Sequence, residues 1–251
     1  MENTEKNMHK YGLIGKDISY SFSQGYFTKK FKSRGLALHT YQNFDLQSID
    51  EFEVILKNPL HIKGMNVTIP YKQAIIPFLY KIDAEAQAIG AVNTLKPCKD
   101  GFIGYNTDAY GFKHALLPHL QPWHKNALIL GTGGASKAVA FVLKSLDITY
   151  HFVSRNARNN NLTYNDITKE ILEEHTIVIN CTPLGTFPNI EDKANIPYQF
   201  LGKNHLLFDL IYNPEETAFL SEGKHKGATI INGLKMLELQ AEKSWEIWNS
   251  K

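Results

Sequence analysis

The stretch from Ala127 to Leu143 limits the possible folds of this chain more than any other segment. It starts with the apolar run Ala127–Leu130, which is typical of a buried parallel strand. A glycine turn follows, Gly131-Thr-Gly-Gly134, and then an alanine-rich run with good helix propensity. Such a strand, turn and helix bind the pyrophosphate of a dinucleotide, because glycines allow close backbone approach and the helix start favours negative charge. Ser136 takes the third position of the glycine fingerprint and is small enough for close packing.

The tip of the next predicted strand, 149–154, indicates which dinucleotide binds. An NAD-binding protein normally has an acidic residue there for the ribose 2′-hydroxyl. This chain has Ser154-Arg-Asn-Ala-Arg158 instead. Because a guanidinium holds a phosphate through paired hydrogen bonds, Arg155 and Arg158 favour NADP. The alternative is that both arginines are solvated loop residues.

Two further strands are predicted to end in polar tails. Residues 176–180 lead into Cys181-Thr-Pro-Leu-Gly185, and residues 206–212 lead into Asn213-Pro214. Open α/β sheets bind ligands beyond the carboxyl ends of their strands, so both tails are candidate ligand contacts. A short strand at 228–231 precedes a final helix, whose predicted apolar stripe consists of Leu234, Leu237, Ala241, Trp245 and Trp248, with Met236 and Gln240 beside it.

The first half of the chain begins with a predicted strand at 10–15 and a serine-rich loop. Ser19, Ser21 and Ser23 alternate before a helix predicted over 24–34. In an extended loop the three hydroxyls would point the same way and suit a carboxylate. Alternatively, Ser23 is the N-cap of the helix and the others are ordinary loop hydroxyls. A second strand, 38–44, and a helix near 47–57 are predicted to follow.

The segment Gly64-Met-Asn-Val-Thr-Ile-Pro-Tyr-Lys72 combines a predicted strand with a lysine in an unfavourable place. Pro70 suits the first helical position, which puts Lys72 in the first helical turn. A cation there opposes the helix dipole by roughly 0.3–1 kcal/mol, and a broken local rule often marks a functional site. The alternative is a solvated lysine. Alternation predicts one apolar and one polar face, formed by Met65, Val67 and Ile69 and by Asn66 and Thr68.

Residues 83–108 are predicted to contain a hairpin that leads to an acidic residue. The hairpin turns at Lys99-Asp-Gly101, and the segment ends in Gly104-Tyr-Asn-Thr-Asp108 before a helix from Ala109. Asp108 therefore lies where a helix N-cap belongs. A cap and a catalytic role both explain it.

The overall composition excludes several classes of protein. A net charge of +2 over 251 residues argues against nucleic-acid binding, and no apolar run has membrane-spanning length. The polar start is no secretory signal, and Cys98 and Cys181 are predicted to be buried thiols of a cytoplasmic protein. His114, His119 and His124 are spaced five apart and share no helix face, so no metal site is expected.

Together, these motifs resemble those of shikimate dehydrogenases, in the expected order from about Tyr11 to Trp248. Gly64–Lys72 is similar to the family's substrate signature, which ends in the catalytic lysine. Gly90-Ala-Val-Asn-Thr94 and Gly104–Asp108 match the next two motifs, the second supplying the catalytic aspartate. The remaining matches are the NADP loop Gly131-Thr-Gly-Gly-Ala135, the arginine clamp from Ser154-Arg155, and the closing motif Asn232–Gln240.

The resemblance implies a role for each matching position. Lys72 and Asp108 would be catalytic, with Asp108 pairing with Lys72 and accepting a hydrogen bond from a substrate hydroxyl. The implied substrate contacts are Ser21, Ser23, Asn66, Thr68, Asn93, Tyr212 and Gln240. The implied NADP contacts are Gly131, Gly133, Gly134, Ala135, Ser154, Arg155, Arg158, Thr182 and Gly233.

The serine loop departs from the family pattern. The family usually has a proline near Asp17, a histidine at Tyr20 and a proline at Gln24. These differences predict a different loop backbone.

The resemblance also implies an α/β architecture with two domains and a cleft between them. The substrate domain would take in 10–108 plus 233–251, and the Rossmann-like NADP domain 109–232. The implied reaction is the reversible NADPH-dependent reduction of 3-dehydroshikimate to shikimate, in aromatic amino-acid biosynthesis, by a monomer or homodimer. The alternatives are a quinate/shikimate dehydrogenase of broader specificity, a non-catalytic ligand-binding relative, and a methyltransferase, although the last normally has an acidic residue near Ser154.

Overall fold

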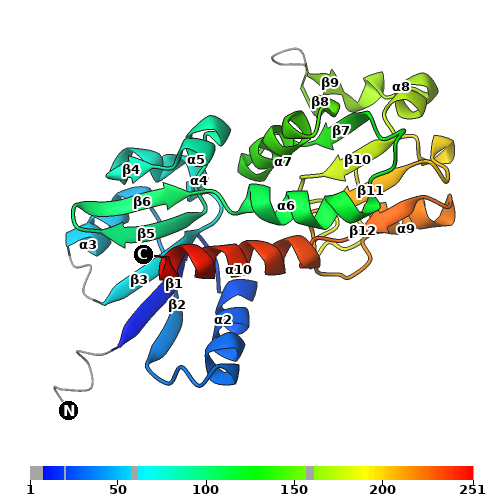
Figure 1. Ribbon diagram of the computed structural model, residues 1–251. Helices are drawn as coiled ribbons and strands as arrows, with labels where there is room; N and C mark the ends of the chain where they lie inside the picture. The colour runs from blue at the N-terminus through cyan, green and yellow to red at the C-terminus, as the bar shows by residue number, and fades with distance from the viewer. Residues whose placement is uncertain (1–7, 20, 58–60, 157–160, 251) are drawn as a thin grey trace. The chain divides into compact units, whose positions relative to one another are not determined.

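A computed structural model of the chain describes residues 8–19, 21–57, 61–156 and 161–250. The chain divides into two compact units. The first takes in the chain up to Thr107 and the segment from Ala241, and the second runs from Asp108 to Gln240. Each unit contains a 6-stranded sheet covered by helices, which confirms the predicted α/β class (Figure 1).

The first unit has a mixed sheet in the order β2-β1-β3-β5-β6-β4. Strands β1, β2 and β3 are parallel, β5 is antiparallel to both β3 and β6, and β4 is parallel to β6. The strand bounds are β1 His9–Gly15, β2 His39–Asp45, β3 Ile62–Val67, β4 Lys81–Ile82, β5 Thr94–Cys98 and β6 Gly101–Tyr105. The helices are α2 Phe22–Ser33, α3 Phe52–Lys57, α4 Tyr71–Ala74 and α5 Ala84–Ile89, with short 3₁₀ turns at Ile49–Glu51 and Ile76–Phe78.

Both faces of this sheet are buried, because β1 contributes to two hydrophobic clusters. Tyr11 and Leu13 pack in a cluster with Phe27 of α2 and Trp248 of α10 (Leu234–Asn249). Ile14 belongs to the other cluster, which includes residues of α3, α4 and α5. Figure 1 shows α2 and the end of α10 beside the β1 and β2 strands. A parallel strand with helices on both faces is therefore apolar on both sides.

Replacing Gly64 with alanine is expected to destabilise the first unit. An added Cβ would lie 2.3 Å from two ring atoms of Trp248, and the Trp248 indole N–H donates to Leu95 O at 3.1 Å. Because that hydrogen bond holds the ring in place, we expect an overpacking cost of about 1–3 kcal/mol in the free energy of unfolding. Chemical denaturation measures it. Gly25→Ala is the matched control, since its Cβ meets nothing within 4 Å; equal unfolding of all three proteins would contradict the prediction.

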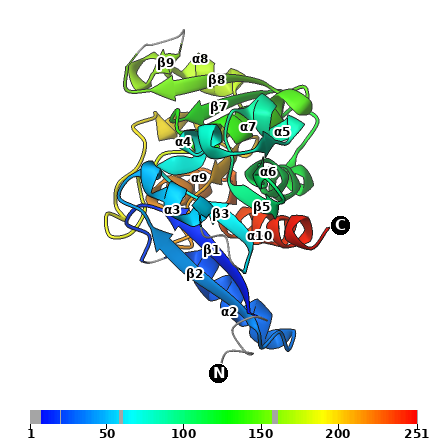
Figure 2. The same cartoon turned by 90° about the vertical axis from the view of Figure 1, so that its left-hand side faces the viewer.

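The second unit has an all-parallel sheet in the order β12-β11-β10-β7-β8-β9. Numbered from β7, this is the 3-2-1-4-5-6 order of Rossmann folds. The strand bounds are β7 Asn126–Leu130, β8 Thr149–Ser154, β9 Leu162–Thr163, β10 Ile177–Asn180, β11 Leu206–Asp209 and β12 Thr229–Ile231. The helices are α6 Asp108–Leu116, α7 Gly134–Ser145, α8 Lys169–Glu174, α9 Ala218–His225 and the first part of α10, with 3₁₀ turns at Leu117–His119, Tyr164–Asp166 and Tyr198–Phe200. Figure 2 shows β7 and β8 side by side.

Four sequence predictions differ from the structure. The helix predicted near 47–57 is a 3₁₀ turn followed by α3, and β3 ends at Val67, so Ile69 leaves the alternation and is 74% exposed. The strand predicted over 206–212 ends at Asp209. Its side chain accepts a hydrogen bond from Ile211 N, which therefore does not continue the strand. On α10, Leu234 is exposed, whereas the buried residues include Met236, Gln240, Ala241 and Trp248.

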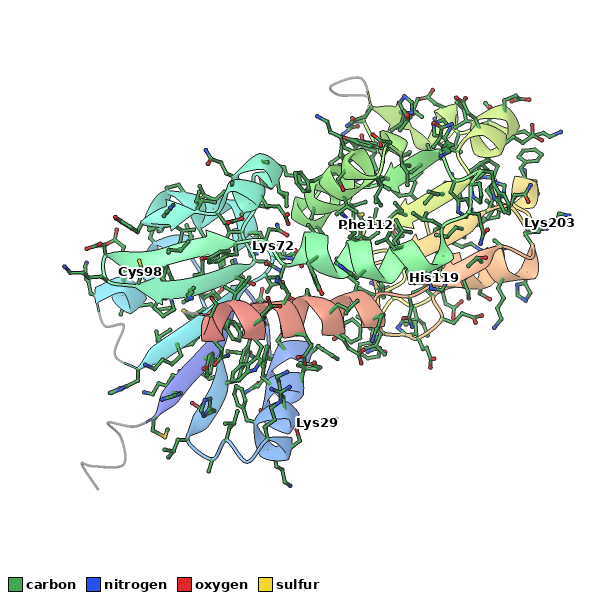
Figure 3. All side chains as sticks on the ribbon, in the orientation of Figure 1. Lys29, Lys72, Cys98, Phe112, His119 and Lys203 are labelled. Atoms are coloured by element: carbon green, nitrogen blue, oxygen red, sulfur yellow. The ribbon has the colours of Figure 1, made fainter. Side chains whose placement is uncertain are left out.

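Other global expectations concern membranes and thiols. Among the described helices, none combines the length and apolar character needed to cross a bilayer. Cys98 and Cys181 are both free thiols, each partly exposed as a residue, and Figure 3 labels Cys98 at the end of β5.

Candidate functional site

Backbone hydrogen bonds join the predicted substrate motifs of the first unit. Thr68 N donates to Ile14 O at 2.8 Å, which ties the end of β3 to the end of β1. Val67 N donates to Asn93 O at 2.8 Å, and Val92 N donates to Lys72 O at 2.7 Å. Segments that lie far apart in the sequence therefore meet at the carboxyl end of β3.

Lys72 is the second residue of α4, directly after this strand end, and its side chain is marked in Figure 3. Pro70 is the N-cap of α4 and not its first helical residue, one position earlier in the helix than predicted. Because α4 is a single turn, 4 residues long, it has little macrodipole, and the expected dipole penalty for Lys72 is small. Lys72 is half-buried, and its backbone carbonyl accepts from Val92 N.

The serine loop differs from its prediction. Ser21, and not Ser23, is the N-cap of α2, and its hydroxyl accepts from Ser23 N at 3.2 Å. Ser23 lies in the first helical turn and is buried. The helix begins at Phe22, so the serines do not alternate along an extended chain.

The backbone of this loop explains one departure from the family pattern. Asp17 has a φ of 54°, in the left-handed region, and its N–H donates to Asp45 Oδ1 at 2.8 Å. A proline, which is locked near a φ of about −65°, cannot adopt this conformation at residue 17. Tyr20, the second departure, lies outside the described residues.

A buried hydrogen-bond network fixes Asn66 and Asn93. Tyr41 donates to Asn66 Oδ1 at 2.9 Å, and burial raises the pKa of this tyrosine, so the hydroxyl keeps its proton. Asn66 Nδ2 donates to Ser244 Oγ of α10 at 2.9 Å. Asn93 Oδ1 accepts from Thr107 N at 2.7 Å. Each amide is therefore held in one orientation by the fold itself.

In the second unit, Asp108 is the first residue of α6 and is 6% exposed. It is one position inside the helix, and not the residue before it as predicted. Gly111 on the same helix allows α10 to approach closely, since an added Cβ would lie 2.5 Å from Met236 O and 3.1 Å from Gln240 Cβ. The close packing of α6 and α10 thus brings the helices of Asp108 and Gln240 together.

The glycine turn lies at the topological switch point of the parallel sheet. β7 pairs with β8 on one side and with β10 on the other, so the turn after β7 faces the residues that follow β10. Gly131 has a φ of 98°, and a Cβ there would lie 3.0 Å from the Thr182 methyl. Only glycine allows this turn and this approach.

The turn suits a phosphate group. Gly133 is the N-cap of the 12-residue helix α7 and, having no side chain, makes no cap hydrogen bond to the first N–H groups of this helix. A Cβ on Gly133 would meet nothing within 4 Å, so the backbone is open on that side. Gly134 and Ala135 begin α7, and Ser136 Oγ donates to Gly133 O at 2.7 Å, which holds the turn. These residues fit the pyrophosphate of a dinucleotide.

A pocket of about 620 Å³ adjoins this turn and the tip of β8. Ser154 and Arg155 both line it, as the sequence predicts for the ribose phosphate. Arg158 lies outside the described residues. The described residues that line the pocket are Thr132, Ser136, Lys137, Phe152, Ser154, Arg155, Asn156 and Asn161.

Thr182, Tyr212 and Gly233 follow the neighbouring strands β10, β11 and β12. Thr182 N and Oγ1 donate to Asn180 Oδ1 at 3.0 and 2.6 Å. Gly233 N donates to Ile211 O at 2.9 Å, and a Cβ on Gly233 would lie 2.1 Å from Leu210 O. Gly233 therefore lies directly against the loop that carries Tyr212.

Sequence reasoning missed several residues around these sites. Ser244 lies one turn after Gln240 on α10 and is fully buried, and a polar residue next to the apolar stripe was its signal. Lys137 lies in the glycine-loop helix, which was the available hint for its place in the pocket. Asp209 is an acidic residue in an otherwise apolar strand, Leu206–Asp209, which was also visible. Among the described residues, no group of three or more His, Cys, Asp or Glu is placed to hold a metal ion.

Comparisons with known proteins show which family this chain resembles. Residues 13–95 match the sequence profile described as the shikimate dehydrogenase substrate binding domain. The chain is 38% identical over 253 aligned residues to the shikimate dehydrogenase (NADP(+)) of Clostridium botulinum, with 96% of both chains covered.

Solved structures show the same similarity. Shikimate dehydrogenase from Aquifex aeolicus superposes with a TM-score of 0.85 at 31% identity, covering 96% of this chain and 92% of that one. The Thermus thermophilus enzyme, solved in complex with NADP(H) and shikimate, has a TM-score of 0.85 at 28% identity, covering 96% and 94%.

Proposed function

This chain belongs to the shikimate dehydrogenase family, and we propose that it catalyses the reversible, NADPH-dependent reduction of 3-dehydroshikimate to shikimate in aromatic amino-acid biosynthesis. The observation that carries this proposal is the backbone junction of the Thr68, Lys72 and Asn93 segments, within the unit that contains the match to the family's substrate-binding domain. The pocket at Arg155 supports NADP as the cofactor.

Lys72 and Asp108 manage the charge that develops on the substrate. NADPH, when bound, supplies the hydride. As the ring ketone is reduced, its oxygen becomes negative, and the Lys72 ammonium stabilises or protonates it. Asp108 accepts a hydrogen bond from a substrate hydroxyl.

The remaining residues bind and orient the two ligands. Ser21 and Ser23 hold the substrate carboxylate, with Tyr212 near it. Asn66, Thr68, Asn93 and Gln240 contact the ring hydroxyls. The cofactor contacts are Gly131, Gly133, Gly134, Ala135, Ser154, Arg155, Arg158, Thr182 and Gly233.

The division of labour between domains is also part of this proposal. We assign 10–108 with 233–251 to substrate binding and 109–232 to NADP binding. We further propose that the protein is a cytoplasmic monomer or homodimer.

A spectrophotometric assay tests the function directly. Purified protein is expected to form NADPH from shikimate and NADP, with slower reduction of NAD and slower oxidation of quinate. Formation of the reduced cofactor, NADPH or NADH, is followed by its absorbance in the same buffer for all four substrate pairs. Preference for quinate would replace the proposal by the broader quinate/shikimate activity. Absence of turnover with either polyol, together with ligand binding, would favour a non-catalytic relative.

A further inference from the structure

A buried carboxylate at the end of β11 has no place in the chemistry described above. Asp209 is 0% exposed. Its Oδ1 accepts from Ile211 N at 3.0 Å and from Asn180 Nδ2 at 3.1 Å, and its Oδ2 accepts from Thr217 Oγ1 at 2.6 Å. Three donors therefore converge on its two oxygens, which is the arrangement of an ionised acceptor.

One side of this network closes the loop that carries Tyr212. Thr217 is the N-cap of α9, and its hydroxyl accepts from Leu220 N at 3.3 Å while donating to Asp209. The loop between Asp209 and Thr217 is thus tied at both of its ends. Ile211 is clamped as well, because its N–H donates to Asp209 and its carbonyl accepts from Gly233 N.

The other side of the network holds the loop after β10. Asn180 donates to Asp209 through Nδ2 and accepts from Thr182 N and Oγ1 through Oδ1. Thr182 Oγ1 in turn accepts from Leu184 N at 3.3 Å. One carboxylate is therefore connected, through at most two successive hydrogen bonds, to Thr182, to Gly233 and to Ile211, the residue next to Tyr212.

We propose that Asp209 is a positioning residue, which holds the Thr182 loop and the Tyr212 loop in the geometry that the reaction requires. The proposal rests on the proposed function, because it needs Thr182, Tyr212 and Gly233 as ligand contacts. Asp209 itself touches neither ligand; it acts through Asn180, Ile211 and Thr217.

The pKa of Asp209 distinguishes a positioning role from a purely structural one. Burial raises the pKa of Asp209 to about 6, against the opposing hydrogen bonds from Thr217, Ile211 and Asn180. A group whose folded pKa is raised from 3.8 stabilises the fold most when protonated, and this contribution is lost as the pH rises through about 6. The ionised carboxylate therefore lowers the free energy of unfolding at neutral pH. A buried aspartate that costs stability is better explained by a functional role than by a purely structural one.

The first test compares Asp209→Asn with the wild type, using shikimate and NADP. The amide matches the shape of the carboxylate but presents a donor where Thr217 needs an acceptor. We expect kcat to fall on the order of 10²-fold at pH 8, since a small misplacement of contact residues has that effect. Binding of 2′,5′-ADP is expected to stay unchanged, because Ser154 and Arg155 lie on β8 and its tip. Ile167→Val, a core change in the same unit, is the stability control and should keep the wild-type kcat.

The pH profile gives a second readout. The wild-type kcat should fall as the pH drops through about 6, and this acidic limb should be missing in Asp209→Asn. Cys181 and Tyr198, the titratable groups that also sense the Asp209 charge, have pKa values raised by burial and stay neutral in this range. An unchanged acidic limb in the variant would overturn the proposal.

Thr217 provides a test that does not depend on Asp209→Asn folding. Thr217→Ser keeps the hydroxyl and should retain kcat, whereas Thr217→Val removes it at nearly the same shape and should lower kcat. Equal kcat values for the two variants, or a wild-type kcat in Asp209→Asn, would overturn the positioning role while the proposed function stands. A wild type that turns over no shikimate would overturn both.

Discussion

Lys72→Ala is expected to lower kcat for shikimate oxidation by about 10²–10⁴-fold, with little change in the affinity for NADPH. The magnitude is that of general acid–base catalysis. The reason is local, because Lys72 lies directly after the β3 end and its carbonyl accepts from Val92 N, in the segment that leads to Asn93. Alanine removes the ammonium and keeps this backbone bond. Steady-state kinetics measure kcat, and fluorescence titration measures NADPH binding.

Lys63→Ala is the matched control for this experiment. Lys63 lies on β3 itself, on the same strand as Asn66 but near its opposite end, and it is exposed. Its loss should leave both kcat and KM near the wild-type values. Wild-type turnover in Lys72→Ala would remove Lys72 from the reaction, and a tenfold or greater loss in both variants would indicate a general effect of lost positive charge.

Arg155→Ala is expected to raise the KM for NADPH by about 10- to 100-fold and to leave the KM for NADH nearly unchanged. A hydrogen bond to a charged group contributes about 1.5–3 kcal/mol, which corresponds to this range. Arg155 lines the pocket at the tip of β8 together with Ser154, where the ribose 2′-phosphate is proposed to bind. NADH lacks this phosphate, so the loss of the guanidinium should not affect it.

Direct binding of 2′,5′-ADP and of 5′-ADP checks the same contact without turnover. The wild type should prefer 2′,5′-ADP, and Arg155→Ala should lose that preference. Lys144→Ala is the control, because Lys144 is an exposed cation at the far end of α7 from the glycine turn. Equal effects of Arg155→Ala on NADPH and NADH would exclude Arg155 from the 2′-phosphate site.

The parallel sheet was the most predictable part of the fold. Ala127–Leu130 is apolar because β7 is a central strand, paired with β8 and β10, and is buried on both faces. Glycine is needed at Gly131 because the turn has a positive φ there. The bounds of β8 were predicted to the residue. Strand ends were less predictable, since β11 stops at Asp209 because of a side-chain hydrogen bond to Ile211.

Helix starts in the substrate motifs were also misjudged. Both Ser21 and Ser23 are good N-cap residues, and local propensity does not choose between them. The structure chooses Ser21, since Ser23 is buried in the first turn of α2 next to the Tyr41 hydroxyl. The choice depends on β2, which is distant in the sequence.

The sequence alone determined the fold class and the cofactor expected at Arg155, because both depend on residue types at short spacing. The reaction expected of Lys72 was implied by the resemblance of its motif to that of shikimate dehydrogenases. Only the tertiary structure showed that backbone hydrogen bonds join the segments that contain Thr68, Lys72 and Asn93, and that Asp209 connects the loops of Thr182 and Tyr212. The contacts between distant segments range from Lys72 with Val92, about 20 residues apart, to Ile14 with Thr68, about 54 residues apart, and such contacts follow from strand order and burial. No local pattern of residues encodes them, so they were decided by how the strands pack.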